Sequence, residues 1–546
     1  MGPLFRIWRI FSLSIVAVFT ILPLDAVYAQ DHDVGIRPDK GSAEIAPPFG
    51  LSAPALARTA STLLLLWDRS PSVDVAGYEV YRDDIRIGST HRLCFTATNL
   101  AANTTYHFSV RAVSAFGGLS RASNRAEAAT KPAGPVFNVQ EYGAKGGGTT
   151  RDTPAIQNAI IACSPGGTVL FPPGDYLVDY IELKSDITVE LKSGATLHFL
   201  PQNEGNYPIT TMRVPGPDGE LVVTNRTLIA AYHVNNLTIT GNGTIMAAGE
   251  SWWRNTNTVR PTVLKLALAT NVLVQGITIA DSPFWNTHAF YADNVIFNDT
   301  KYVRISKAGS LNSDGLDPDS SRDVLIAGCY FSTQDDSIAI KSGKVFPGQP
   351  KRQRPCENIV IRDCLFVGTV TPGPQSLGFA VGSEICGGVR NVLMENCEFT
   401  NTASLANIKA NRDRLNGSVE NISIENCHYV NTSFKDEPWN RAPISVDLFY
   451  YNRKEDPDGQ LPLTPATPVF RNIHFKNITV SNLVGRGIYL SGLAERPVQN
   501  LTFTNVTVWA KTGLFGRNLD GITLNHVSVN ARQGAPFEWM NVKNRR

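Results

Sequence analysis

One repeat constrains the fold of this chain more than any other feature of its sequence. Each copy starts with Asn or Asp and carries apolar side chains at most of the positions one, three, six and eight residues later. The copies start at Asn271, Asp323, Asn358, Asn391, Asn421, Asn472 and Asn500. Three successive intervals in the middle of the run are 35, 33 and 30 residues long. This spacing indicates two short strands joined at a bend, which bury little surface until copies stack. The repeat therefore predicts an all-β fold built as a solenoid of parallel β-strands.

Four of the eight cysteines occupy one position of this repeat. They are Cys329, Cys364, Cys397 and Cys427. Stacked coils would place them about 4.8 Å apart along the direction of strand pairing, and side chains in such a ladder rarely have the torsion of a disulfide. We therefore expect them to act as small apolar core residues. Cys356 and Cys386 lie outside this ladder, and the sequence leaves open whether they pair.

Acidic side chains gather at two turns, at Asp314 and at Asp335–Asp336. One copy of the repeat lies between these turns, and 22 residues separate Asp314 from Asp336. We interpret 22 residues as one revolution, which places Asp314 and Asp336 at the same corner of neighbouring coils. The next coil would bring Ser376 near that corner, and the coil after it would bring Lys409 to the same face.

Carboxyl groups this close together cannot ionise independently, and their repulsion separates proton donors from proton acceptors. Coil spacing and side-chain reach would allow the gap of ~6.5–9.5 Å between the two carboxyl groups of an inverting glycosidase. Lys409 would offset the acidic charge and hold an anionic sugar. A single Asp is ordinary in a turn, but three on one ladder beside a lysine predict a catalytic site.

The N-terminal end predicts export. Arg6 and Arg9 precede an apolar run, and residues 27–29 provide a small-residue cleavage site, so residues 1–29 are interpreted as a signal peptide. Pro23 and Asp25 end the apolar run before it reaches the roughly 20 residues of a membrane span. We expect a protein of the periplasm or the extracellular medium, with no stable membrane anchor after cleavage.

The remaining chain divides into a tether and two domains. Residues 30–47 are polar without periodicity, and residues 48–131 alternate apolar and polar positions in short runs, which predicts a small β-sandwich. Residues 136–546 carry the repeats and the acidic turns. The net charge of +2 gives no overall field that would favour nucleic acid as a partner. We expect a monomer without cofactor or metal.

Two families share motifs with this sequence. The strands around Trp67 and GYEVYR (77–82) resemble a fibronectin type III domain. The segments NSDG (312–315), QDD (334–336), SPFW (282–285) and NIK (407–409) resemble motifs of glycoside hydrolase family 28, the polygalacturonases.

The second resemblance implies a right-handed parallel β-helix that hydrolyses α-1,4-linked galacturonan with inversion. It implies that Asp335 is the general acid and that Asp314 and Asp336 hold the attacking water. It also implies that Lys409 binds the uronate and that Asn312 shapes the acidic turn. Polygalacturonate or pectin would be the bound partner.

Two departures from the family pattern concern the substrate. Ser376 stands in place of the histidine of the family's Gly-His-Gly, and Asn407 replaces the arginine of its Arg-Ile-Lys. Arg412 or Arg414 is a candidate replacement for that arginine. His288 and Tyr450 are candidate sugar contacts, although a histidine at a strand end and an aromatic residue on a strand are also common structural residues.

Exo action is the favoured prediction, with long inserts at residues 201–222 and 434–470 as candidate walls of the site. Endo-polygalacturonase and rhamnogalacturonan hydrolase are alternatives within the same chemistry. A pectate lyase could use the three acids as a calcium site, because Ca²⁺ prefers oxygen ligands. A non-catalytic, polysaccharide-binding β-helix is the alternative outside enzymes.

Overall fold

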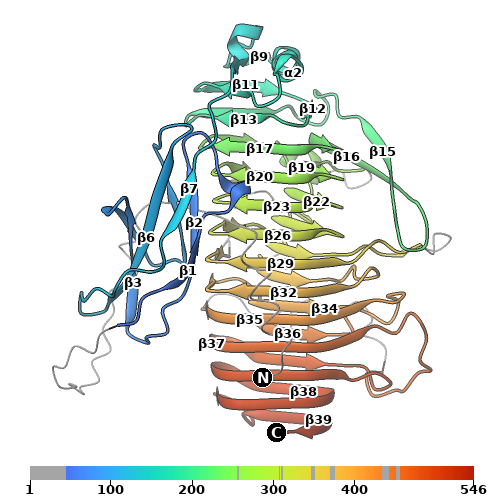
Figure 1. Ribbon diagram of the computed structural model, residues 1–546. Helices are drawn as coiled ribbons and strands as arrows, with labels where there is room; N and C mark the ends of the chain where they lie inside the picture. Colours follow the sequence, from blue (N-terminus) through green and yellow to red (C-terminus); the bar gives the residue numbers. More distant parts are fainter. Residues whose placement is uncertain are drawn as a thin grey trace. The chain divides into compact units, whose positions relative to one another are not determined.

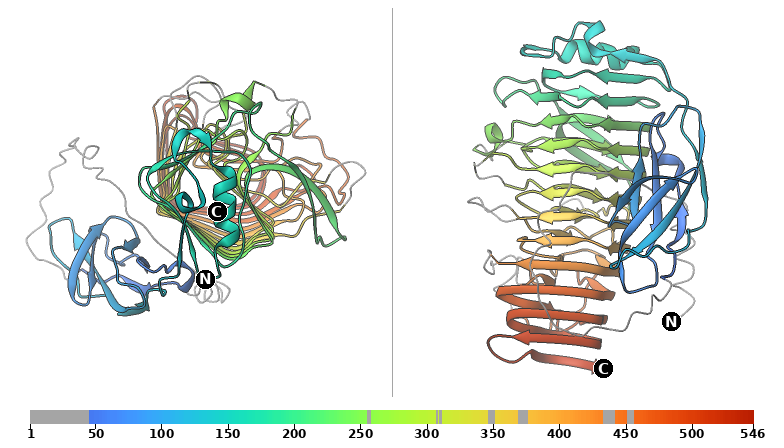
Figure 2. Two further views of the ribbon diagram at one scale, coloured as in Figure 1. Left: turned by 90° about the horizontal axis from the view of Figure 1, so that it is seen from above. Right: turned by 90° about the vertical axis from the view of Figure 1, so that its left-hand side faces the viewer.

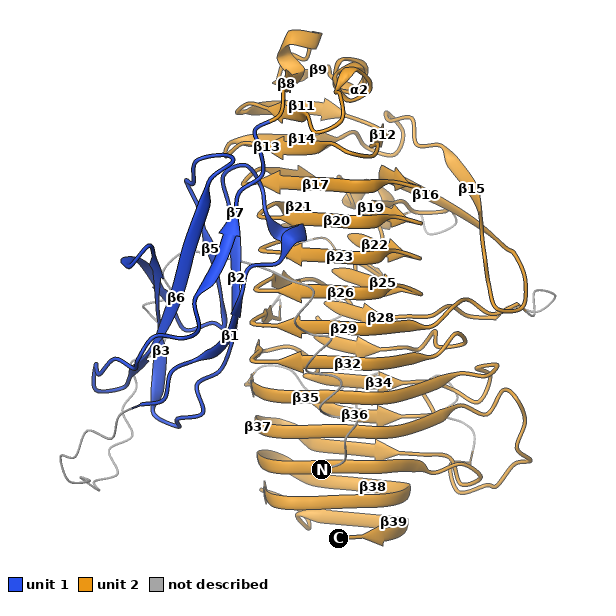
Figure 3. Cartoon of the chain, in the orientation of Figure 1, with its two compact units in different colours: residues 1–133 blue, residues 134–546 orange. Residues whose placement is uncertain are grey.

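The computed structural model describes residues 45–546 except 255–257, 307, 309–310, 346–350, 369–375, 433–441 and 451–455. The expected signal peptide and most of the expected tether lie outside the described residues. The chain forms two compact units, residues 1–133 and 134–546, and each is described by itself (Figure 3).

The first unit is a sandwich of two antiparallel sheets, with strand orders β1-β2-β5 and β4-β3-β6-β7. Its elements are β1 (Phe49–Ser52), η1 (Ala55–Ala57), β2 (Leu63–Asp68), β3 (Val75–Arg82), β4 (Ile85–Thr90), β5 (Cys94–Ala97), β6 (Thr105–Ser114) and β7 (Ala126–Ala129). Trp67 is buried between the sheets and meets the Tyr78 ring edge-on, with centroids 5.6 Å apart. The alternation in the sequence is thus that of a β-sandwich.

The second unit is a parallel β-helix in which most coils add one strand to each of three sheets (Figure 1). The first sheet contains β12 (Ile181–Glu182), β16 (Leu221–Tyr232), β19 (Thr262–Ala267), β22 (Thr287–Phe290), β25 (Leu316–Asp319), β28 (Ile338–Ile340), β31 (Phe379–Val381), β34 (Ala406–Lys409) and β36 (Ile444–Asp447). The second contains β8 (Val136–Asn138), β10 (Thr168–Phe171), β13 (Thr188–Leu191), β17 (Asn235–Gly241), β20 (Thr270–Gln275), β23 (Asp293–Asn298), β26 (Arg322–Ala327), β29 (Cys356–Arg362) and β32 (Val389–Glu395). The third contains β9 (Gly147–Arg151), β11 (Gly174–Val178), β14 (Ala195–Phe199), β18 (Thr244–Met246), β21 (Thr278–Ala280), β24 (Lys301–Val303), β27 (Tyr330–Ser332), β30 (Leu365–Val367) and β33 (Glu398–Thr400).

The last coils are built from longer strands that continue around the bends. They are β35 (Ser418–Asn431), β37 (Val469–Ser491), β38 (Val498–Ala531) and β39 (Phe537–Arg545). At the opposite end, η2 (Val139–Tyr142) and α2 (Thr153–Ala162) lie over the first coils, as the view along the axis shows (Figure 2). A short helix, α3 (Glu250–Trp253), follows β18.

Asn and Asp at the head of each repeat form a ladder along the second sheet. The members of this ladder from Asp323 to Asn500 have φ angles of 54–60°, a left-handed conformation that Asn and Asp tolerate. Each amide donates to the residue one coil earlier at 2.9–3.2 Å. A second ladder, absent from the sequence analysis, starts five residues later at Asp363, Asn396, Asn426, Asn477 and Asn505.

The core repeats in the same way. Tyr302, Phe331, Phe366 and Phe399 stack with ring centroids 4.3–5.1 Å apart. The four cysteines of the repeat are buried and free, and so are Cys356 and Cys386. The alternating pattern of the sequence therefore predicted both the fold class and the residues that fill its core.

The insert at residues 201–222 contributes a hairpin of β15 (Ile209–Val214) and the first half of β16. Met212 and Val214 pack against Ala267, Phe290 and Tyr291, which lie at the ends of β19 and β22. Near its tip, Asp218 forms an ion pair with Arg352 at 2.8 Å, just before β29. The hairpin thus runs past several coils, as Figure 1 shows.

Candidate active site

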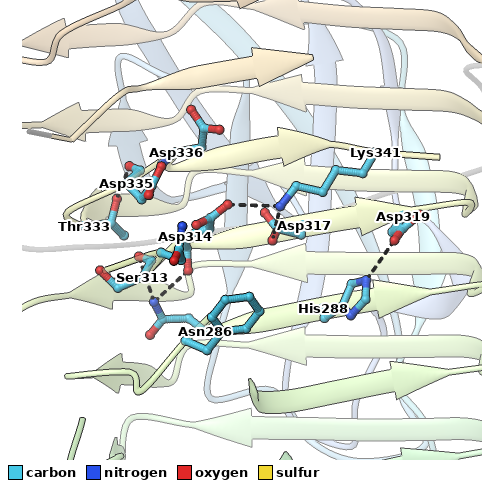
Figure 4. A network of polar contacts seen from close by, with 12 residues as sticks. Asn286, His288, Ser313, Asp314, Asp317, Asp319, Thr333, Asp335, Asp336 and Lys341 are labelled. Carbon is cyan, nitrogen blue, oxygen red and sulfur yellow. Dashed lines mark hydrogen bonds and ion pairs between the residues drawn. The ribbon is translucent and has the colours of Figure 1, made fainter. Parts of the chain in front are cut away.

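The two acidic turns lie one coil apart, as their spacing predicted. Leu316 pairs in register with Ile338, and the backbone N–H of Gly315 donates to the carbonyl of Asp336 at 3.0 Å. One carboxylate oxygen from each of Asp314, Asp335 and Asp336 lies within 4.8 Å of the others (Figure 4). The oxygens are therefore closer together than the expected gap of ~6.5–9.5 Å between carboxyl groups. The reason is that one coil step separates two of the acids and the third is a sequence neighbour.

Asp335 is the one of these three residues that is not fully buried. Its Oδ1 accepts a hydrogen bond from the backbone N–H of Asp336 at 2.9 Å. Closely packed surroundings and the charges of Asp314 and Asp336 raise the pKa of Asp335 to about 8, although Lys409 opposes the shift. Asp335 is therefore protonated at neutral pH and can donate a proton.

Both the backbone and the side chain of Asp314 make polar contacts. Its backbone carbonyl accepts a hydrogen bond from the Asn286 side chain at 2.8 Å, and its Oδ2 forms an ion pair with Lys341 at 3.0 Å (Figure 4). Burial raises the pKa of Asp314, and the Lys341 ammonium limits the rise. The same ammonium contacts Asp317 at 2.9 Å and lies 3.5 Å from the centre of the Trp285 ring.

Asp336 divides its two oxygens between different tasks. Its Oδ2 forms an ion pair with Lys409 at 2.8 Å, and the Lys409 ammonium lies 4.8 Å from the centre of the Tyr450 ring. Its Oδ1 is buried and has no hydrogen-bond partner among the described residues. A buried carboxylate oxygen without a partner is costly, and a water molecule between Asp314 and Asp336 would satisfy it.

Lys341 was missed by the sequence analysis, although a signal for it exists. Ile340, Val381 and Ile408 are register partners, so Lys341 and Lys409 occupy equivalent positions two coils apart. Burial would lower the pKa of Lys341, but Asp314 and Asp317 raise it well above its usual value. The acidic partners of Lys341 lie on the preceding coil, so only the register reveals the contact.

Asn312 lies in the turn before Asp314 with a φ of 53°. Its side-chain oxygen accepts a hydrogen bond from Arg260 at 2.8 Å, and Arg260 lies over the Phe284 ring with 4.9 Å to its centroid. Burial lowers the pKa of Arg260, while the charges of Asp314 and Asp335 act to raise it. Arg260 is thus a second cation near the acids that the sequence analysis did not single out.

His288 lies one coil before Asp314 and is buried. Its Nε2 is 3.2 Å from Asp319 Oδ2, and its ring meets Trp285 edge-on at 4.8 Å. Burial and the charge of Lys265 lower the pKa of His288 to about 4 despite Asp319. The imidazole is therefore neutral near pH 7 and donates a hydrogen bond to the Asp319 carboxylate rather than acting as a cation.

The other residues that were considered for substrate binding lie on the coils that follow the three acids. Arg412 forms a two-point ion pair with Glu495 at 2.8 and 3.0 Å, and Arg414 is fully buried and donates to the carbonyl of Ser383. Ser376 is fully buried and shares a 3.0 Å hydrogen bond with Ser337. The guanidinium groups of Arg412 and Arg414 are thus already engaged.

Comparison with known proteins identifies this arrangement. The family model "Glycosyl hydrolases family 28" matches residues 165–524, about two thirds of the chain. The chain belongs to glycosyl hydrolase family 28. A fibronectin type III domain model matches residues 46–128. The predictions of a glycosidase, of a parallel β-helix and of a fibronectin-like domain are confirmed, whereas the individual site residues stay predictions.

Relatives of this family 28 enzyme include the exo-poly-alpha-D-galacturonosidase of Dickeya chrysanthemi, 24% identical over 91% of this chain and 93% of the relative. A probable polygalacturonase of Vitis vinifera is 27% identical over 68% of this chain and 74% of the relative. The solved family 28 exopolygalacturonase of Yersinia enterocolitica has the same fold, with a TM-score of 0.77 at 21% identity over 91% of this chain and 99% of that one.

No helix in the described part of the family 28 enzyme combines the length and apolar character that a membrane crossing requires.

Proposed function

We propose that this family 28 enzyme hydrolyses α-1,4-linked galacturonan, polygalacturonate or pectin, from a chain end and with inversion. The observation that supports this proposal best is a carboxyl group, Asp335, with a pKa near 8 beside two further carboxyl groups, Asp314 and Asp336. Two lysines pair with these acids. An acid, a base and cations for a uronate substrate thus lie together.

In the proposed reaction, Asp335 donates its proton to the glycosidic oxygen as the bond from that oxygen to C1 breaks. A water molecule held by Asp314 and the free Oδ1 of Asp336 attacks C1 and gives up a proton to one of these carboxylates. That proton then passes through a further water molecule to Asp335, so that all three carboxyl groups return to their initial protonation states. Lys409 would share its charge between Asp336 and the carboxylate of the bound uronate.

The acid assignment can be tested with Asp335→Asn, which keeps the size of the side chain and removes the proton donor. Release of reducing ends from polygalacturonate should fall by roughly 10²–10⁴-fold, the usual contribution of general acid catalysis. Unchanged turnover in the folded variant would refute the assignment. A wild-type protein that binds the polymer without cleaving it would instead favour the polysaccharide-binding alternative.

Inversion needs its own test, because the carboxylate oxygens lie closer together than expected for an inverting pair. Retaining enzymes have carboxyl groups about 5–5.5 Å apart and form a covalent intermediate. Proton NMR of the first product distinguishes the two outcomes. Inversion at an α-linkage gives the β-anomer first, and an initial α-anomer would indicate retention.

Exo action is supported by the β15–β16 hairpin, which packs on the ends of β19 and β22, two strands of the sheet to which the acidic turns lead. It is also supported by the exo-acting relative from Dickeya chrysanthemi, which aligns over most of this chain. Product analysis on polygalacturonate should show mono- or digalacturonate from the start of the reaction. A rapid drop in viscosity with mixed oligomers would indicate endo action.

The substrate is the least constrained part of the proposal, since Ser376 and Asn407 replace a histidine and an arginine of the family pattern. Parallel assays on polygalacturonate, methylated pectin and rhamnogalacturonan would rank the candidates. A lyase acting through calcium at the three acids would instead form an unsaturated, ultraviolet-absorbing product and lose activity with a chelator.

We also propose that the enzyme is exported to the periplasm or the medium and acts there as a monomer. The residues that suggest export, 1–29, lie outside the described part of the chain. Cell fractionation with N-terminal sequencing of the mature protein tests cleavage near Ala29. Light scattering of the purified protein tests the oligomeric state.

A further inference from the structure

Three lysines lie on the outer side of the first sheet, and all are almost completely buried. Lys265 on β19, Lys341 directly after β28 and Lys409 on β34 expose 3%, 4% and 2% of their surface. Lys341 and Lys409 each form ion pairs with acids of the site. Lys265 forms no hydrogen bond and no ion pair with any residue of the described ranges.

Aromatic and neutral groups surround the Lys265 ammonium. Its Nζ lies 4.9 Å from the centre of the Phe290 ring, and its register partner on β22 is the neutral His288. Asp319 is the acid that acts on it electrostatically. That carboxylate already binds His288 through Oδ2 at 3.2 Å (Figure 4), and its Oδ1 accepts a hydrogen bond from the Ser320 hydroxyl at 2.9 Å. The charge of Lys265 therefore has no carboxylate of its own.

A buried ammonium without a counter-ion is unfavourable, and the fold does not require one at this position. The strand neighbour of Lys265 on the preceding coil is Ala230. A small apolar residue can therefore occupy the equivalent position of the sheet, and the strand pairing does not need a lysine there. Burial lowers the pKa of Lys265 to about 8, with Asp319 opposing the shift. An anion placed against Nζ would stabilise the charged form of Lys265 and offset the cost of its burial.

Lys265 also lies at a suitable distance from the acids. Register pairs join Lys265 to His288 and His288 to Asp317, so two coil steps, or about 10 Å, separate Lys265 from the coil of Asp314. Phe290, beneath the ammonium, belongs to the apolar cluster that fixes the β15–β16 hairpin. The position therefore lies beside the hairpin and two coils away from the acids.

We propose that Lys265 binds the carboxylate of a second uronate unit of the substrate, different from the unit that Lys409 holds. Phe290 and His288 orient the ammonium without neutralising it. This inference rests on the proposed function, because it takes an oligomer of uronates as the ligand. In this role, Lys265 favours substrates that carry a negative charge on a sugar unit other than the one at the cleaved bond.

The test measures binding in an Asp335→Asn background, where cleavage is slow enough for the oligomer to stay intact during the measurement. Calorimetry compares tetragalacturonate with its carboxyl-reduced, uncharged counterpart, for Lys265 and for Lys265→Met. Loss of one charge-assisted hydrogen bond should weaken binding of the charged oligomer by roughly ten- to a hundredfold. Binding of the uncharged oligomer should change little. Lys301→Met on β24, in the third sheet, serves as the matched control.

Each outcome has one meaning. Equal loss for both oligomers, or no loss for either, would overturn the role of Lys265 while leaving the proposed function in place. Failure of the Asp335→Asn protein with Lys265 intact to bind tetragalacturonate would count against the proposed function itself. In steady-state assays Lys265→Met should affect KM more than kcat, and the effect should grow with oligomer length. A purely structural lysine would lower the melting temperature without this dependence on length.

Discussion

Replacing Lys341 with Met removes one charge that two buried carboxyl groups share. Lys341 contacts Asp314 at 3.0 Å and Asp317 at 2.9 Å, and all three side chains are at most 5% exposed. Breaking a buried ion pair by removal of one partner costs about 3–5 kcal/mol in the free energy of unfolding. Burial already raises the pKa of Asp317 well above its usual range, which disfavours the charged form that pairs with Lys341. We therefore expect a cost nearer to that of one pair than of two.

The loss of folding stability in Lys341→Met should depend on pH in one direction. Burial raises the pKa of Asp314 and of Asp317 above their values in the unfolded chain, and Lys341→Met raises both further. The folded state then binds more protons than the unfolded chain, so stability falls as the pH rises between the two pKa values. The loss of stability caused by Lys341→Met should therefore be larger at pH 8 than at pH 5.

Urea unfolding of the full chain at pH 5 and pH 8 measures this effect, with Lys301→Met as the control for loss of a lysine. Lys341→Arg keeps the charge and should lose less stability than Lys341→Met. Activity should also fall in Lys341→Met, because a protonated Asp314 cannot accept a proton from water. Equal midpoints for variant and wild type at pH 8, or a difference that does not shrink at pH 5, would refute this account of Lys341.

Other predictions concern the acids and their neighbours. Activity should decline as the pH rises through about 8, because the Asp335 proton is then lost; a pH profile of kcat/KM that stays flat to pH 10 would contradict this. Arg260→Gln removes a positive charge near Asp314 and Asp335 and the hydrogen bond to Asn312, so the alkaline limb of that profile should move to higher pH and kcat/KM should fall about tenfold. Tyr450→Phe keeps the ring beside Lys409 and should retain activity, whereas Tyr450→Ala should raise KM several-fold, as initial rates on polygalacturonate would show.

The sequence predicted those parts of the molecule that follow from periodicity. Alternation within the repeat was enough to predict the stacked strands, the buried cysteines and the single coil step between Asp314 and Asp336. The second Asn ladder has the same chemistry but was not recognised, because its members follow the first ladder after only five residues.

The contacts that the sequence did not predict depend on side chains that meet across coils. Lys341 finds its partners 24 and 27 residues earlier, and Arg260 reaches Asn312 across 52 residues. The pairing of Arg412 with Glu495, 83 residues later, was also not predicted, and the contact of Arg412 with substrate stays a prediction. Spacing places a residue on a coil, whereas the direction of a long side chain depends on neighbours that periodicity does not specify.

The asparagine ladder has a consequence for how such an enzyme can change. Successive members are separated by as few as 28 and as many as 51 residues, yet their hydrogen bonds keep nearly the same length. Extra residues therefore leave at the corners as loops and do not shift the strands. Loop length can vary freely around the substrate while the acids keep their alignment. Substrate range and catalytic geometry are in this way separately adjustable parts of one chain.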